Sequence, residues 1–116
     1  MTVDQLRNIS LKLPGVTEDI KWDTHVCFNV ADKMFLVTSP DELPVSASFK
    51  VDESDFHEII SRPGFEKQKH LGRHHWVHLD DINRLTKKEW ETHIEESYKL
   101  VASKLSNKMR KQLGLL

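Results

Sequence analysis

The sequence has little cysteine, glycine or proline and no long hydrophobic run. Its one cysteine, Cys27, cannot form an internal disulfide or a cysteine-rich zinc site, which is typical of a protein in a reducing compartment. No uncharged apolar run approaches the roughly 18 residues that a membrane span requires. The first residues, Met-Thr-Val-Asp-Gln, lack the basic flank and apolar stretch of an export signal. We therefore expect a cytoplasmic protein without a membrane partner.

Motifs for nucleotide chemistry and nucleophilic catalysis are also absent. Neither G-x-G-x-x-G nor G-x-x-x-x-G-K-[ST] occurs, so no cofactor is expected. His25, Cys27 and Asn29 have the residue types of a thiol-nucleophile triad. However, neighbours on one strand face project in parallel about 7 Å apart, whereas a base must come within about 3 Å of its nucleophile. The sequence therefore predicts no enzymatic activity.

The seven histidines of the chain suggest a possible metal site. The densest group is His70, His74, His75 and His78. On a strand, His74 and His78 would share a face about 13 Å apart, too far for one ion, and His75 would point the other way. A site would need His70 to fold back, or a partner such as His57 or His93. We predict no metal site and interpret these histidines as polar surface residues.

The composition, with 38% hydrophobic and 30% charged residues among 116, predicts one compact domain. The formal net charge of -1 conceals an uneven distribution. Residues 17–58 hold ten acidic residues and three lysines, whereas residues 99–116 hold five bases and no acid. Arg62, Lys67, Lys69 and Arg73 precede the histidine group. Any contact with a polyanion is expected in these basic segments.

Three helix starts share a capping residue, an acid or amide three positions later, and apolar residues that clasp the first turn. These starts are Thr2 with Gln5, Asp52 with Asp55, and Thr86 with Glu89. The first helix should end before Pro14-Gly15 and the second before Pro63-Gly64. The third is the longest, with an apolar stripe at helical spacing: Trp90, Ile94, Ser97/Tyr98, Val101 and Leu105.

Alternating apolar residues predict strands in the remaining segments. Residues 25–30 and 34–38 form a hairpin, residues 45–49 a third strand, and residues 65–69 and 75–79 a further pair. The predicted order is α-β-β-β-α-β-β-α. Because most consecutive strands have no helical crossover, we expect an α+β fold: a two-layer α/β sandwich with an antiparallel sheet and the helices on one face.

Six short segments occur in a recognisable order along nearly the whole chain. They are Leu13-Pro14-Gly15, Trp22, Lys33-Met34-Phe35, Pro63-Gly64, His75-Trp76-Val77 and Glu96-Ser97-Tyr98. In this order the sequence resembles the MmcQ/YjbR family of small bacterial domains. The resemblance implies a fold like that of type III secretion chaperones, with an analogy to a "double wing" DNA-binding domain, and no established substrate or catalytic residue. Where members often have Asn-Lys-Arg before His-Trp, this chain has Gly72-Arg73-His74, which replaces one expected cation with a mostly neutral histidine.

A nucleic-acid interface would bind phosphates through basic residues, with Trp76 stacking on a base. The candidate residues are Lys67, Lys69, Arg73 and His74 in the hairpin and Lys108, Arg110 and Lys111 in the tail. Alternatively, the lysines only solvate the surface, Trp76 packs between sheet and helices, and His75 bonds nearby backbone. Dedicated nucleic-acid binders typically have a pI above about 9, whereas the pI of this chain is about 6.6. DNA binding should therefore be weak and salt-dependent.

Residues 107–116 form a predicted basic amphipathic tail after a YjbR-like domain of residues 1–106, with Met109, Leu113 and Leu116 at helical spacing. The tail could dock on its own domain, pair with a second subunit or contact a partner protein. We expect a non-enzymatic cytosolic binding domain that contacts DNA through the hairpin and the carboxyl terminus. The alternative is a protein-interaction module or small homodimer without nucleic-acid binding, and an enzyme with an unrecognised small-molecule pocket is a third hypothesis.

Overall fold

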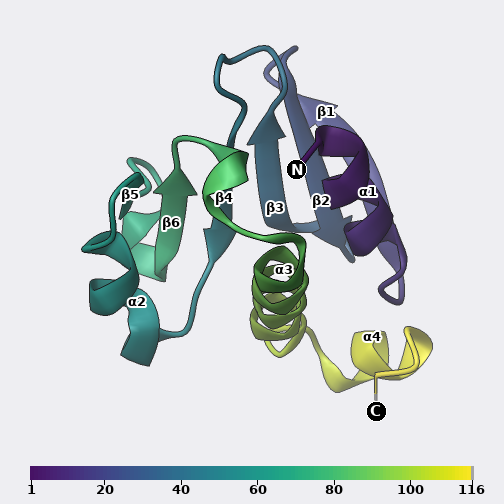
Figure 1. The fold of residues 1–116 in the computed structure, drawn as a ribbon. Coiled ribbons are helices and arrows are strands. Elements are labelled where there is room, and N and C mark those ends of the chain that lie inside the picture. Colours follow the sequence, from purple (N-terminus) through teal and green to yellow (C-terminus); the bar gives the residue numbers. More distant parts are fainter. Residues whose placement is uncertain (116) are drawn as a thin grey trace.

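A computed structural model describes residues 1–115 as one α+β fold (Figure 1). The strands are β1 (Val16–Lys21), β2 (His25–Val30), β3 (Lys33–Ser39), β4 (Ser46–Lys50), β5 (Phe65–Lys67) and β6 (Trp76–Leu79). The helices are α1 (Val3–Leu11), α2 (Glu53–Ile60), α3 (Lys87–Ala102) and α4 (Asn107–Gln112). Two short 3-10 helices, η1 (Gly72–His74) and η2 (Ile82–Arg84), flank β6.

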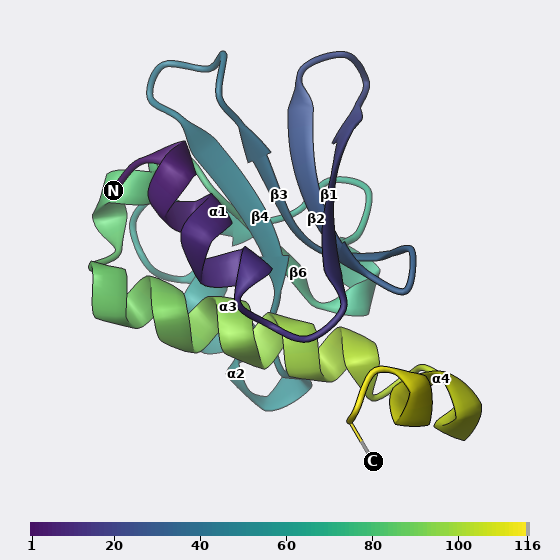
Figure 2. The same ribbon diagram turned by 90° about the vertical axis from the view of Figure 1, so that its right-hand side faces the viewer.

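The six strands form one antiparallel sheet in the order β1-β2-β3-β4-β6-β5. The helices α1, α2 and α3 contribute side chains to one hydrophobic cluster, and Figures 1 and 2 show α1 and α3 packed against the same face of the sheet. The predicted α+β class, the antiparallel sheet and the placement of the helices on one face are confirmed. The opposite face of the sheet carries no helix of residues 1–115.

Strand β1 is an addition to the predicted order, and α4 follows the predicted last helix. The residues in the middle of β1 are exposed because this strand lies at an edge of the sheet, so they do not alternate in polarity as strands usually do. The last strand also begins one residue later than predicted, at Trp76. His75 has a left-handed φ of 63° after the η1 turn, which prevents it from extending the strand.

The predicted helix starts are confirmed at the level of individual hydrogen bonds. Thr2 with Gln5 and Thr86 with Glu89 both form complete capping boxes, in which each partner bonds the other's backbone N–H. Asp52 caps α2 by accepting from the backbone N–H of Ser54, not from that of Asp55. Capping chemistry alone therefore located these three helix starts.

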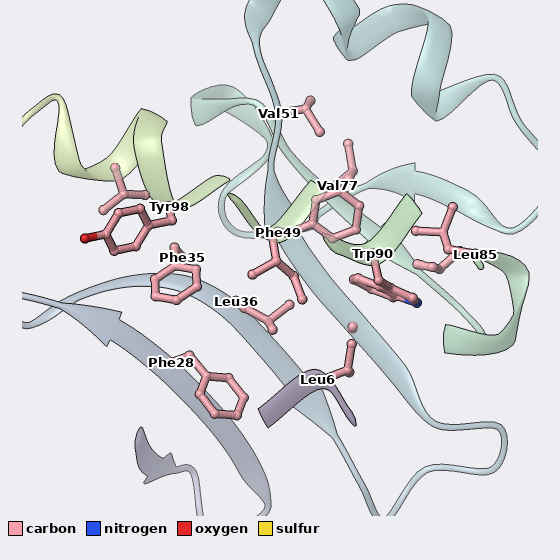
Figure 3. Packing of buried hydrophobic residues seen from close by; sticks show 14 of the residues in the cluster. Leu6, Phe28, Phe35, Leu36, Phe49, Val51, Val77, Leu85, Trp90 and Tyr98 are labelled. Carbon is pink, nitrogen blue, oxygen red and sulfur yellow. The ribbon is translucent and has the colours of Figure 1, made fainter. Parts of the chain in front are cut away.

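Large aromatic and aliphatic side chains fill the space between sheet and helices (Figure 3). A β-bulge next to Phe28 lets both Phe35 and Leu36 join this core, although adjacent strand residues normally face opposite ways. Trp90 of α3 is fully buried, contacts the Phe49 ring edge to face, and donates its indole N–H to the Ile82 carbonyl at 2.8 Å. The core therefore fixes α3 across β3 and β4.

The carboxyl-terminal segment packs against the same core. Leu113 and Leu115 are partly buried there, and Leu113 covers Gly15, where a Cβ would lie 2.4 Å from the leucine Cδ2 atom. Leu116, the third apolar residue of the predicted tail stripe, lies outside the described residues. The two leucines that follow α4 thus contact their own domain, whereas Met109 within α4 is exposed. Within residues 1–115, no helix is both long enough and apolar enough to cross a bilayer.

Candidate functional site

The segment Glu96-Ser97-Tyr98 joins α3 to three other parts of the fold. The Ser97 hydroxyl donates to the Phe35 carbonyl at 2.6 Å and accepts from the Lys50 N–H at 3.0 Å. The Tyr98 hydroxyl donates to the Pro14 carbonyl at 2.6 Å, and a Glu96 carboxylate oxygen accepts from the Asp52 N–H at 3.3 Å. These bonds satisfy backbone groups of the sheet and loops, so they give the segment a structural role.

The other motif residues divide between the two faces of the sheet. Phe35 and Val77 lie in the helix-covered core, whereas Met34 and Trp76 belong to a small cluster on the helix-free face. Lys33 is exposed at the start of β3, and the His75 ring packs on Phe56 at 5.3 Å between centroids. Trp22 differs from the other motif aromatics because 67% of its surface is exposed.

Most of the predicted basic residues gather at one end of the sheet, which we call the basic end. The registers place the start of β1, the end of β2, the starts of β3 and β6 and the ends of β4 and β5 at this end. Lys67, Lys69, Arg73 and His74 are exposed there on β5, η1 and the loop between them. Within residues 1–115, no salt bridge is formed by Lys67, Lys69 or Arg73.

Two further lysines, absent from the predicted set, belong to the basic end. Lys50 donates from Nζ to the His74 carbonyl at 2.7 Å, which fixes its ammonium group beside η1. Burial, together with repulsion from Lys104, lowers the pKa of Lys50 below its ordinary value. Lys104 follows α3 and leads into α4. Because the two ammonium groups repel each other, a bound anion would relieve an existing electrostatic cost.

The tail bases extend the basic end toward β1. Lys108, Arg110 and Lys111 lie on α4, whose Leu113 covers the loop before β1. The hairpin bases lie at the opposite edge, about 24 Å away across six strands spaced about 4.8 Å apart. Asp32 in the β2–β3 turn and Asp52 before α2 stand at the same end. The bases therefore form two patches, one on β5 and η1 and one on α4; Figure 1 shows β5 at the left of the sheet and α4 at the lower right.

The helix-free face contains the largest of the described cavities, with a volume of about 620 Å³, which we call the groove. Its floor includes Val37 and Trp76, and its walls come from the β1–β2 turn, the β3–β4 connection and the segment Gln68–Leu71. Trp76 is only 5% exposed. The alternative prediction, that Trp76 packs between sheet and helices, is wrong, because its cluster with Cys27 and Val37 lies on the helix-free face. A base could stack on Trp76 only by entering the groove.

Several polar groups line the groove. The Ser48 hydroxyl and His78 Nδ1 are 2.9 Å apart, and the Ser46 hydroxyl donates to Glu42 Oε2 at 2.7 Å. Within residues 1–115 no carboxylate is hydrogen-bonded to the other nitrogen of His78, so the serine–histidine pair lacks the third member of a hydrolytic triad. Sequence patterns could not locate this face, because its residues come from strands distant in the chain.

Cys27 lies beneath the groove with no exposed surface, and burial raises the pKa of its thiol. The ring of His25 is hydrogen-bonded to Thr24 instead, so His25 does not activate the thiol. His74 belongs to η1 and His78 to β6. In the described part of the chain, no three His, Cys, Asp or Glu side chains lie close enough together to hold a metal ion.

These features define an open-faced α+β domain with helices on one side of its sheet and a groove on the other. A model of the family described as YjbR matches residues 11–100. The chain belongs to the YjbR family, as the sequence resemblance indicated. No curated protein matches it.

Two crystal structures have the same fold. Deinococcus radiodurans protein DR2400, which has a DUF419 domain, superimposes with a TM-score of 0.88 at 28% identity, over 99% of this chain and 89% of that chain. A Pseudomonas syringae protein superimposes with a TM-score of 0.71 at 21% identity, over 87% of this chain and 99% of that chain. At that identity the second likeness concerns the fold alone.

Proposed function

We propose that this protein is a non-enzymatic, cytosolic binding domain that contacts nucleic acid through its basic end. The observation that carries the proposal is the exposed set of unpaired cations on the β5–η1 segment, next to Lys50 and Lys104. Elsewhere on the surface Arg7, Arg62, Arg84 and Lys99 are paired with carboxylates. Unpaired cations next to one another are suited to phosphates, which position a nucleic acid without reading its sequence.

The charge distribution also limits the strength of this interaction. Asp32 and Asp52 separate the two basic patches, so the protein can pair its cations with only a few phosphates of one nucleic acid at once. For about four such contacts on duplex DNA, raising the salt from about 50 to 200 mM should weaken binding on the order of 100-fold. We expect weak binding with little sequence preference.

Fluorescence anisotropy with labelled duplex DNA, single-stranded DNA and RNA at these two salt concentrations tests the proposal. The test variant is Lys69→Ala/Arg73→Ala, which removes two exposed cations from the hairpin. The control is Lys87→Ala/Lys88→Ala, which makes the same charge change at the other end of α3. The test variant should lower the salt slope by about two and the control should leave it unchanged. Equal binding by both variants would remove the basic end as the interface.

The alternative role, a protein-interaction module or homodimer, receives no support from the tail. Leu113 and Leu115 are partly buried against the domain's own core, and Met109 is the large apolar side chain of α4 that stays exposed. A truncation after Asn107 should therefore lower stability without changing the number of subunits, as measured by light scattering. Fewer subunits after truncation would favour the alternative.

A further inference from the structure

The groove is large enough for a small organic molecule and is separate from the basic end in its chemistry. Its volume of about 620 Å³ lies within the roughly 300–1,000 Å³ of typical ligand sites. Trp22, Met34, Leu71 and Trp76 give it mostly apolar walls. The indole of Trp22 is 67% exposed and meets the His25 ring edge to face, with centroids 5.4 Å apart. An exposed tryptophan beside a cavity offers a ligand an aromatic surface without any rearrangement.

The charges around the groove discriminate between ligand classes. Among residues 1–115 no lysine or arginine lines it, so a phosphate or carboxylate ligand would lose its water without gaining an ionic partner. Glu42 is the one carboxylate among the lining residues. Its Oε2 atom accepts from the Ser46 hydroxyl, which orients the group and leaves Oε1 for a ligand. An ammonium group can pair with that carboxylate, and the faces of Trp22 and Trp76 also favour cations.

We propose that the groove binds a small organic cation with an aromatic body, a class represented by arylalkylamines. The ring lies against Trp76 and Met34, Trp22 contacts it from the β1–β2 turn, and the ammonium group pairs with Glu42. The left-handed φ values of Trp22 (53°) and Asp23 (63°) form the tight turn that carries the indole to the groove. The site is independent of the proposed nucleic-acid contact, which requires the opposite charge.

The three tryptophans provide a probe with an internal reference. The indole N–H signals of Trp22, Trp76 and Trp90 can be followed by ¹H–¹⁵N NMR in the full-length protein. Trp22 and Trp76 line the groove, whereas Trp90 is fully buried on the other side of the sheet and donates to Ile82. The probe is 2-phenylethylamine, and its matched anion is 3-phenylpropionate, with the same ring and two-carbon spacer.

Titration with the amine should shift the Trp22 and Trp76 signals saturably, with an affinity on the order of millimolar for a ligand of this size, and leave Trp90 unchanged. The anion should bind at least about tenfold more weakly. Glu42→Gln should remove this discrimination between amine and anion, and Trp22→Ala should weaken the binding of the amine. Glu91→Gln, at a carboxylate on the exposed surface of α3, is the matched control and should bind as the unaltered protein does.

Three results would overturn the proposal. If neither Trp22 nor Trp76 shifts saturably, the groove does not take this class of ligand. If the amine and the anion bind equally well, or Glu42→Gln leaves the discrimination intact, the assignment of a cation is wrong. Trp22 and Glu42 are both exposed, so these substitutions should leave the fold in place, and the unchanged Trp90 signal would verify it.

Discussion

Replacement of Ser97 by alanine should destabilise this domain far more than the loss of one hydroxyl on a surface helix. The register pairs Leu36 with Phe49, so the next pair along the two strands would be Phe35 and Lys50. There the Ser97 hydroxyl accepts a hydrogen bond from the Lys50 N–H and donates one to the Phe35 carbonyl. One buried side chain of α3 thus completes the ladder between β3 and β4.

The magnitude follows from the two groups that Ser97→Ala would leave without a partner. A buried donor or acceptor that loses its partner costs about 1–3 kcal/mol, and the Lys50 N–H is only partly buried, so its share lies near the lower limit. Ser97 itself has no exposed surface, so bulk water does not reach the two groups in the native fold. Alanine regains about 0.5 kcal/mol of helix propensity. The net loss should be about 2–3 kcal/mol.

Urea unfolding followed by tryptophan fluorescence measures this loss. With a slope of about 1–3 kcal/mol/M, the midpoint should fall by about 1–2 M, and the melting temperature by about 8–12 °C. The control is Ser103→Ala on the same helix, where the exposed hydroxyl donates to the Leu100 carbonyl at 2.7 Å and water can replace it. Its effect should stay within about 0.5 kcal/mol. Equal effects for the two variants would refute the role assigned to Ser97.

Two further predictions concern pH and the docking of α4. Burial lowers the pKa of His93 below its ordinary 6.5, and its ring packs on Phe49. Below pH about 6.5, His93 therefore binds a proton more readily in the unfolded chain than in the folded protein. The free energy of unfolding should fall as the pH is lowered from about 7 to 5. His93→Gln should reduce that fall in urea midpoints measured at both pH values, and an unchanged fall would exclude His93 as its source. Gly15→Ala should destabilise by about 2 kcal/mol, because φ is +72° and a Cβ would displace Leu113. The control Gly114→Ala, with φ +75° and open space, should cost less in the same thermal melts, and equal costs would argue against docking of α4 through Leu113.

Local patterns predicted most of this fold because most of its elements have local causes. The capping pairs Thr2/Gln5 and Thr86/Glu89 mark helix starts through bonds between residues three apart. Alternating apolar and polar residues identified β2 and β4, which are inner strands of the sheet with most of their residues buried. The pattern failed for β1, whose hydrogen bonds to β2 decide its conformation while its side chains stay exposed.

The candidate sites were predicted less completely, because they depend on contacts between distant segments. Exposed bases are visible in a sequence, so Lys69 and Arg73 could be named. Lys50 could not, since its neighbours His74 and Lys104 come close only through the β4–β6 pairing and the crossing of α3. The groove was beyond any local pattern, because Glu42 and Trp76 reach the same face from separate strands and loops.

The two proposed sites share one segment of chain, and this makes their tests control each other. His70 and Leu71 line the groove, whereas Lys69 and Arg73, which flank this pair within two residues in the sequence, are exposed and do not line it. If Lys69→Ala/Arg73→Ala only removes charge, the Trp76 indole signal should stay in place while nucleic-acid binding weakens. If the signal moves, the substitutions have shifted the loop that walls the groove. A loss of nucleic-acid binding in that variant would then report on the loop's position as well as on two phosphate contacts.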